Sequence, residues 1–255
     1  MSLPLPLLDL VALAFLLGGL PLASLVQLRF MEGVEIRRVP AYLSSAATLV
    51  VLGVAAWLVG AREEGASGLG LGQAPVGPVL MWATVLVVSG MGLVMAFRQA
   101  AIVLGVGESA VLRSLMPRTA RERGIFAVLS LTAGVGEEMA YRGYALTTLA
   151  GVAGAGWAAV ITSLVFGVLH GYQGWLGVAR TASLGGLLAW GYLASGSLWA
   201  PMAAHVVLDL VLGIALADRL MVPERGSGVS VVVGSEAGED APPREQHGRG
   251  SGASR

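Results

Sequence analysis

The chain has no cysteine, and charged residues make up only 13% of its 255 residues. Without thiols it cannot use a cysteine nucleophile, a cysteine-ligated zinc site or a disulfide. Hydrophobic residues account for 55% of the chain, whereas about 25% of a soluble domain is charged, so the composition indicates a membrane protein. The formal net charge is zero, which gives no electrostatic basis for binding nucleic acid.

Long apolar stretches dominate the first 220 residues. Seven of them are near the ~20 residues that a helix needs to cross a bilayer: 5–28, 41–60, 77–97, 124–148, 152–171, 176–195 and 198–220. Each should be helical, because lipid offers backbone groups no other hydrogen-bond partner. The sequence therefore predicts an all-α, polytopic membrane helical bundle of about seven transmembrane helices, or eight if another helix lies near 98–112. The first stretch is expected to be a retained span rather than a signal peptide.

The arginines predict an orientation. Lysine is absent, and arginine clusters lie at 29–38, 98–123 and 219–255. Seven spans would place these three clusters on one side of the membrane, and the positive-inside rule makes that side cytoplasmic. We therefore expect a multi-pass protein of the cell inner (plasma) membrane, with its N-terminus outside and its C-terminus in the cytoplasm. An eighth span would break this parity.

The composition changes after residue 222. Residues 223–255 are rich in Gly, Ser, Pro, Glu and Arg, which is typical of disorder. The sequence thus predicts an integral-membrane helical domain over 1–222 and a disordered cytoplasmic tail over 223–255. His247 lies in this tail and is not a candidate for catalysis.

Two adjacent carboxylates interrupt the fourth apolar stretch. Glu137 and Glu138 are followed by Arg142. A charge at the bilayer centre costs roughly 2.5–3.5 kcal/mol on insertion scales, so these residues indicate a function. In a helix, Glu138 and Arg142 share a face and can form an ion pair. Glu137 points roughly 100° away, so it can face a cavity and have a separate role.

Two histidines lie in the later apolar stretches. His170 follows Phe166 by four residues, and His205 and Asp209 are also four apart, so each pair shares a helix face. Three helices could bring Glu137 and both histidines around one wet pocket. A carboxylate and imidazoles there could activate water and stabilise an oxyanion. A Glu–Arg pair can also be a purely structural link, and a single histidine in a span can be a helix-to-helix hydrogen bond. The combination favours function.

At these residues the sequence resembles the CAAX protease and bacteriocin-processing family, also called the CPBP or Abi family. The family signature is Glu-Glu-x-x-x-Arg, then Phe-x-x-x-His, then His-x-x-x-Asn or -Asp. The chain has these motifs at 137–142, 166–170 and 205–209. The resemblance covers roughly residues 120–215, the expected catalytic half. It implies an intramembrane glutamic-type endopeptidase without a covalent intermediate.

The resemblance also assigns roles. The candidate catalytic residues are Glu137, Glu138, Arg142, His170, His205 and Asp209. Glu137 and His170 would activate the water, and His205 and Asp209 would position the scissile carbonyl or its oxyanion. Glu138 and Arg142 would organise the site. The best-studied eukaryotic relatives have Asn at the last position; an ionised Asp209 cannot donate a hydrogen bond, so Asp209 is either protonated or orients His205.

Four alternatives are open. A zinc peptidase could use the same side chains as ligands, but the His-Glu-x-x-His motif is missing, so no metal or other cofactor is expected. A serine protease would need Ser67, which lies in a polar, Gly-rich loop. An aspartyl protease would need a partner for Asp209, and Asp9 lies near the end of a span. A bacteriocin-immunity protein or transporter would use the polar residues without proteolysis.

The expected partners are the lipid bilayer and a membrane-associated protein or peptide substrate. That substrate could be a C-terminal sorting tail or a prenyl-like tail, and nothing in the sequence chooses between them.

Overall fold

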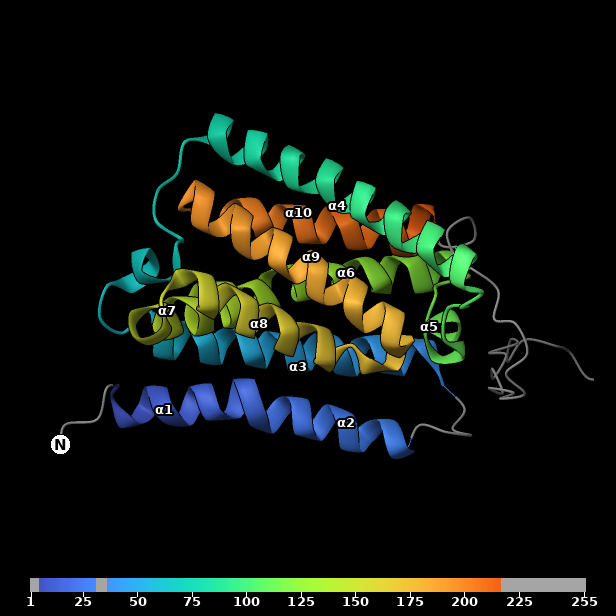
Figure 1. The fold of residues 1–255 in the computed structure, drawn as a ribbon, viewed down its shortest axis with the longest axis horizontal. Helices are drawn as coiled ribbons and strands as arrows, with labels where there is room; N and C mark the ends of the chain where they lie inside the picture. The colour runs from blue at the N-terminus through green and yellow to red at the C-terminus, as the bar shows by residue number, and fades with distance from the viewer. Residues whose placement is uncertain (1–4, 31–35, 217–255) are drawn as a thin grey trace, which may run out of the picture.

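The computed structural model describes residues 5–30 and 36–216, and in that part of the chain it consists of helices without any strand (Figure 1). The predicted all-α fold is confirmed. The predicted tail over 223–255 and the end of the last predicted span lie outside the described residues, and the division at residue 222 stays a prediction.

The helices form seven rods at the seven predicted positions. Their bounds are α1 (Leu7–Ala14), the π-helix η1 (Phe15–Gly19), α2 (Leu20–Phe30), α3 (Arg38–Gly60), the 3-10 helix η2 (Gly65–Leu69), α4 (Val76–Leu104), α5 (Ala110–Ser114), α6 (Ala120–Glu138), the π-helix η3 (Met139–Leu146), α7 (Thr147–Ala153), α8 (Ala155–Leu169), the 3-10 helix η4 (Gly171–Gln173), α9 (Gly174–Ser195), α10 (Trp199–Leu210) and the π-helix η5 (Val211–Ala215). The first rod joins α1, η1 and α2, and the fourth joins α6, η3 and α7.

Three of these rods are long and apolar enough to cross a membrane: Leu7–Phe30, Arg38–Gly60 and Val76–Leu104. The pair Ala155–Leu169 and Gly171–Ser195 meets the same criterion only as one unit, which is bent by 61°. The described helices thus supply three spans, or four with the bent pair, and the predicted seven or eight stay a prediction. The segment considered for an eighth helix holds only the end of α4 and the beginning of the five-residue α5.

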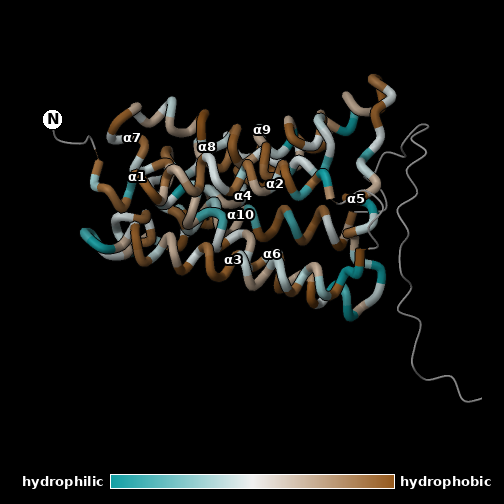
Figure 2. Tube along the Cα trace, turned by 90° about the horizontal axis from the view of Figure 1, so that it is seen from below, coloured by the Kyte–Doolittle hydropathy of each residue, from teal (hydrophilic) through white to brown (hydrophobic). Residues whose placement is uncertain are grey.

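The outer surface of the rods is apolar. Leu58 and Val51 are each 69% exposed, and Trp157 is 68% exposed. Along the rods the chain is mostly hydrophobic, and hydrophilic segments gather toward the two ends (Figure 2). Large apolar side chains in such numbers on the outside suit contact with lipid rather than water.

Most of the described arginines lie at the end of the bundle where α5 lies. They are Arg29, Arg37, Arg38, Arg113, Arg118, Arg121, Arg123 and Arg180. Arg62 lies at the opposite end, just after α3. Arg98 was expected in a loop between spans, but it lies within α4, because that helix continues to Leu104.

Glycines let α6 pack closely against its neighbours just before the two glutamates. A Cβ on Gly136 would overlap the backbone carbonyl of Leu49 in α3. A Cβ on Gly134 would overlap the side chain of Val206 in α10. These contacts fix the C-terminal part of α6 between α3 and α10, and so they place Glu137 and Glu138 in the interior.

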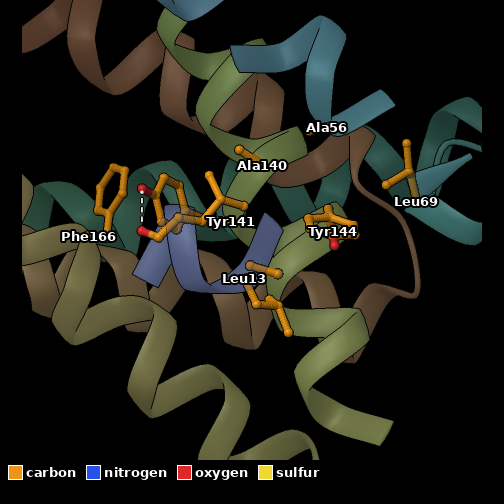
Figure 3. Close-up of a cluster of buried hydrophobic side chains, with 9 residues drawn as sticks. Leu13, Ala56, Leu69, Ala140, Tyr141, Tyr144 and Phe166 are labelled. Atoms are coloured by element: carbon orange, nitrogen blue, oxygen red, sulfur yellow. Dashed lines mark hydrogen bonds between the residues drawn. The ribbon is translucent and has the colours of Figure 1, made fainter. Parts of the chain in front are cut away.

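The first rod is attached to η3, the π-helix that follows the glutamates. Tyr141 donates a 3.4 Å hydrogen bond to the Leu16 carbonyl within a buried apolar cluster (Figure 3). One turn further, Tyr144 donates to Asp9 at 2.9 Å, and Asp9 also pairs with Arg62. The N-terminal rod therefore covers the helix that carries the candidate site.

Candidate functional site

Glu138 is the centre of a buried ionic group. It is fully buried, and Arg142 is 1% exposed. Nη1 of Arg142 donates to Glu138 Oε1 at 2.7 Å, so the ion pair expected from the four-residue spacing is present. Nδ1 of His205 contacts the same oxygen at 2.9 Å. Because a buried charge is stable only when it is paired and hydrogen-bonded, these partners explain how Glu138 is held in the interior.

Arg142 links three helices through its other contacts. Nη2 donates to the Gly185 carbonyl of α9 at 3.0 Å. The guanidinium carbon lies 4.6 Å from the centre of the Phe166 ring in α8, a cation–π distance. Arg142 thus connects η3 to both helices of the bent pair as well as to Glu138.

Glu137 has different surroundings from its neighbour. It is partly exposed and lines a cavity. Its Oε2 lies 3.7 Å from Nε2 of His205, and Oδ2 of Asp209 lies 3.8 Å from the same nitrogen. The two adjacent glutamates therefore approach opposite sides of one imidazole, Glu138 at Nδ1 and Glu137 at Nε2. Because a carboxylate oxygen accepts hydrogen bonds, Nδ1 of His205 carries a hydrogen.

His170 is oriented by its own helix. Nδ1 lies 2.8 Å from the Phe166 carbonyl, which can only accept, so this nitrogen is the donor. Nε2 of a neutral ring is then free to accept a proton. The Phe166 ring lies between the histidines, with its centroid 4.8 Å from that of His170 and 6.1 Å from that of His205. Among the described residues, no carboxylate lies within ion-pair distance of His170.

The cavity has a volume of about 720 Å³. Glu137, His170, His205 and Asp209 all line it, whereas Glu138 and Arg142 lie behind its wall. The remaining walls come from α2, α3, α4, α5, α6, η3, α8, η4, α9, α10 and η5, and the cavity extends from the middle of the bundle to α5. The predicted residues are thus brought to one place, four in the cavity and two in its support.

A second polar group, which was not predicted from the sequence, lies at the α5 end of the cavity. Arg180 in α9 donates to Glu108 at 2.6 Å and to Gln173 at 3.1 Å. Ser109 donates to the Tyr172 carbonyl at 2.6 Å. These contacts fix η4, the segment directly after His170. The available signal was Arg180 itself, a charge within the sixth apolar stretch.

The alternatives find less support in the geometry. Within residues 5–30 and 36–216, no group of three or more His, Asp or Glu side chains is arranged to hold a metal ion. Ser67 lies in η2. Among the described residues, its side chain makes no hydrogen bond to His170 or His205. Asp9 is bonded to Tyr144 and Arg62 rather than to a second aspartate.

A family model described as Type II CAAX prenyl endopeptidase Rce1-like matches residues 119–211. The matched segment begins at the N-cap of α6 and ends just after α10, so it contains all six candidate residues. This match confirms the family resemblance inferred from the sequence. Together with the apolar helices, it supports an intramembrane protease. No curated protein and no solved structure matches the chain.

Proposed function

We propose that the protein is an intramembrane glutamic endopeptidase, which hydrolyses a peptide bond of a membrane-associated substrate with water activated by Glu137. One observation carries the proposal: of two adjacent glutamates, one is fully buried in an ion pair, and the other lines the cavity that His170 and His205 also line. A carboxylate that only stabilised the fold would not need to line a cavity.

In the proposed reaction, Glu137 takes a proton from a water molecule as the water oxygen attacks the scissile carbonyl carbon. The carbonyl oxygen becomes an oxyanion in a tetrahedral intermediate. The proton then passes to the leaving amine as the C–N bond breaks, and the products are a carboxylic acid and an amine. No side chain bonds covalently to the substrate.

His170 is the second group at the water. Its Nδ1 is occupied by the Phe166 carbonyl, so a neutral ring directs the lone pair of Nε2 away from its own helix. That lone pair can accept a hydrogen bond from the water and orient it for attack. The Phe166 ring at 4.8 Å limits the rotation of the imidazole.

His205 and Asp209 are proposed to act at the carbonyl side. Glu138 holds the His205 ring through Nδ1, and this directs Nε2 toward Glu137 and Asp209. With a proton on Nε2, His205 can donate to the oxyanion. Asp209 lies within 3.8 Å of this nitrogen, which favours the role of orienting and stabilising the protonated ring.

The location of the cavity suggests how substrate reaches it. Its lining extends from Glu137 and Tyr141 to Leu112 of α5, at the end of the bundle where the arginines gather. By the positive-inside rule this end is cytoplasmic. We therefore propose that the active site is approached from the cytoplasmic side of the plasma membrane. A C-terminal sorting or prenyl-like tail is the proposed substrate.

The test compares newly formed protein termini in membranes that contain the wild-type protein or Glu137→Gln. Mass spectrometry of labelled termini should find cleavage products with the wild type and with Glu63→Gln, a matched control because the Glu63 side chain is 77% exposed and outside the site. The Glu137→Gln membranes should lack these products. Products that also form with Glu137→Gln, or no products with the wild type, would contradict the proposal.

A further inference from the structure

Arg98 is a charged residue of α4 in a helix that is otherwise apolar enough to cross a membrane. It lines the same cavity as Glu137, His170 and His205. Arg98 as a whole is half-buried, and its Nε atom is buried without a hydrogen-bond partner among the described residues. An ionisable residue in such a helix is costly, and one that faces a cavity is a candidate for a functional site.

Arg98 differs from the other interior arginines. Arg142 pairs with Glu138 at 2.7 Å, and Arg180 pairs with Glu108 at 2.6 Å. Arg38, which is 8% exposed, pairs with Glu122. Within residues 5–30 and 36–216, by contrast, no carboxylate lies within ion-pair distance of Arg98. Each of these three guanidinium groups has an ion-pair partner from the protein itself, although Nε and Nη2 of Arg38 are also buried without a hydrogen-bond partner among the described residues.

We propose that Arg98 binds the C-terminal carboxylate of the peptide substrate, an inference that rests on the proposed endopeptidase function. A guanidinium group presents its donors in a planar fork that fits both oxygens of a carboxylate. Arg98 lies outside residues 119–211, the part of the chain that the family model matches. It is therefore a feature of the N-terminal half that would select substrates by where their chain ends.

The register of the helices sets the distance from this site to the reacting groups. Figure 1 shows that α4 and α10 run in the same direction. A Cβ on Gly90 of α4 would lie 2.8 Å from the side chain of Leu208, the neighbour of Asp209. Arg98 is eight residues beyond Gly90, a rise of about 12 Å toward α5. An extended peptide rises about 3.3 Å per residue, so a few residues of substrate would separate a carboxylate at Arg98 from a carbonyl beside Asp209.

The same guanidinium could bind the phosphate of an anionic lipid, so the experiment separates the two sources. Full-length Glu137→Gln protein in detergent is titrated with fluorescent decapeptide pools whose last six positions are randomised among Ala, Val, Leu and Ser. One pool has a free C-terminal carboxylate and the other a C-terminal amide. Because this variant is not expected to cleave, binding is measured apart from turnover. Equal binding of the two pools would therefore leave the proteolysis test, which maps new protein termini in membranes, unaffected.

The carboxylate pool should bind about tenfold more tightly than the amide pool. Adding Arg98→Gln should abolish this preference, and Arg98→Lys should restore part of it. Arg121→Gln, which removes an exposed positive charge at the same end, should leave it unchanged. The proposal is overturned if the pools bind equally or not at all, or if the preference survives Arg98→Gln. It is also overturned if phosphatidylglycerol in nanodiscs displaces the carboxylate pool in an Arg98-dependent manner.

Discussion

Glu138 and His205 lie 67 positions apart in the chain, yet Oε1 of the first and Nδ1 of the second are 2.9 Å apart. This contact joins α6 to α10 and determines which imidazole nitrogen faces the cavity. Since Arg142 donates to the same oxygen, the contact connects the buried ion pair to the cavity. Oε1 of Glu138 therefore belongs both to the buried ion pair with Arg142 and to the contact that orients His205.

Replacing Arg142 by alanine should destabilise the protein strongly. The change would remove one partner of a buried ion pair and leave Glu138 with only its contact to His205, at a cost of about 3–5 kcal/mol. It would also remove the contacts to Gly185 and Phe166. Thermal unfolding in detergent measures the effect. The double variant Glu138→Gln/Arg142→Leu should unfold at a higher temperature than Arg142→Ala, because it removes both buried charges. Wild-type stability of Arg142→Ala would mean that the pair is solvated.

Gly185 should not tolerate a side chain, whereas its neighbour should. A Cβ on Gly185 would lie 3.1 Å from Nη2 of Arg142 and 3.4 Å from the Phe166 ring. A Cβ on Gly186 would meet only Ser163, at 3.9 Å. Since alanine favours a helix interior over glycine by roughly 0.5–1 kcal/mol, Gly186→Ala should be as stable as the wild type or more so. Gly185→Ala should unfold earlier and lose activity, and equal stability of the two variants would count against the described packing of Arg142.

Proteolysis should survive removal of metal ions. The proposed chemistry uses a carboxylate and imidazoles, and within the described residues no cluster of ligands is arranged to hold a metal. Cleavage should therefore continue after exhaustive treatment with a chelator that is small enough to enter the cavity. Elemental analysis of the purified protein provides the control. One zinc per chain, lost together with activity and restored with it, would replace the account with a metal-dependent one.

The sequence was sufficient to predict the helices and to select six candidate residues that the fold brings together. Apolar length set the seven helical positions, and helical spacing placed Glu138 with Arg142. The spacing also separated the environments of the two glutamates, because neighbours on a helix point in different directions. Apolar length alone does not determine the number of membrane spans, because only three of the described helices, or four with the bent pair, are long and apolar enough to cross a membrane. The helix that carries the glutamates is rich in charge near its start, and α8 and α9 are bent at a break.

Contacts between distant helices could not be predicted from spacing alone. Nothing in the sequence indicated that one oxygen of Glu138 would contact both Arg142 and His205, because that contact depends on the packing of α6 against α10. Arg98 lies just beyond the predicted span 77–97. In the structure α4 continues past it, and the arginine enters the cavity wall.

The most direct test of the account is the turnover of Glu137→Gln on a peptide taken from an identified cleavage site. Glutamine preserves the shape of the side chain but cannot accept the proton of water, and a general base contributes about 10²–10⁴-fold to the rate. The account predicts a fall in kcat of at least about 100-fold with an unchanged unfolding temperature, while Glu63→Gln keeps wild-type turnover. Near wild-type kcat in a folded Glu137→Gln protein would contradict the central claim that this carboxylate activates the water.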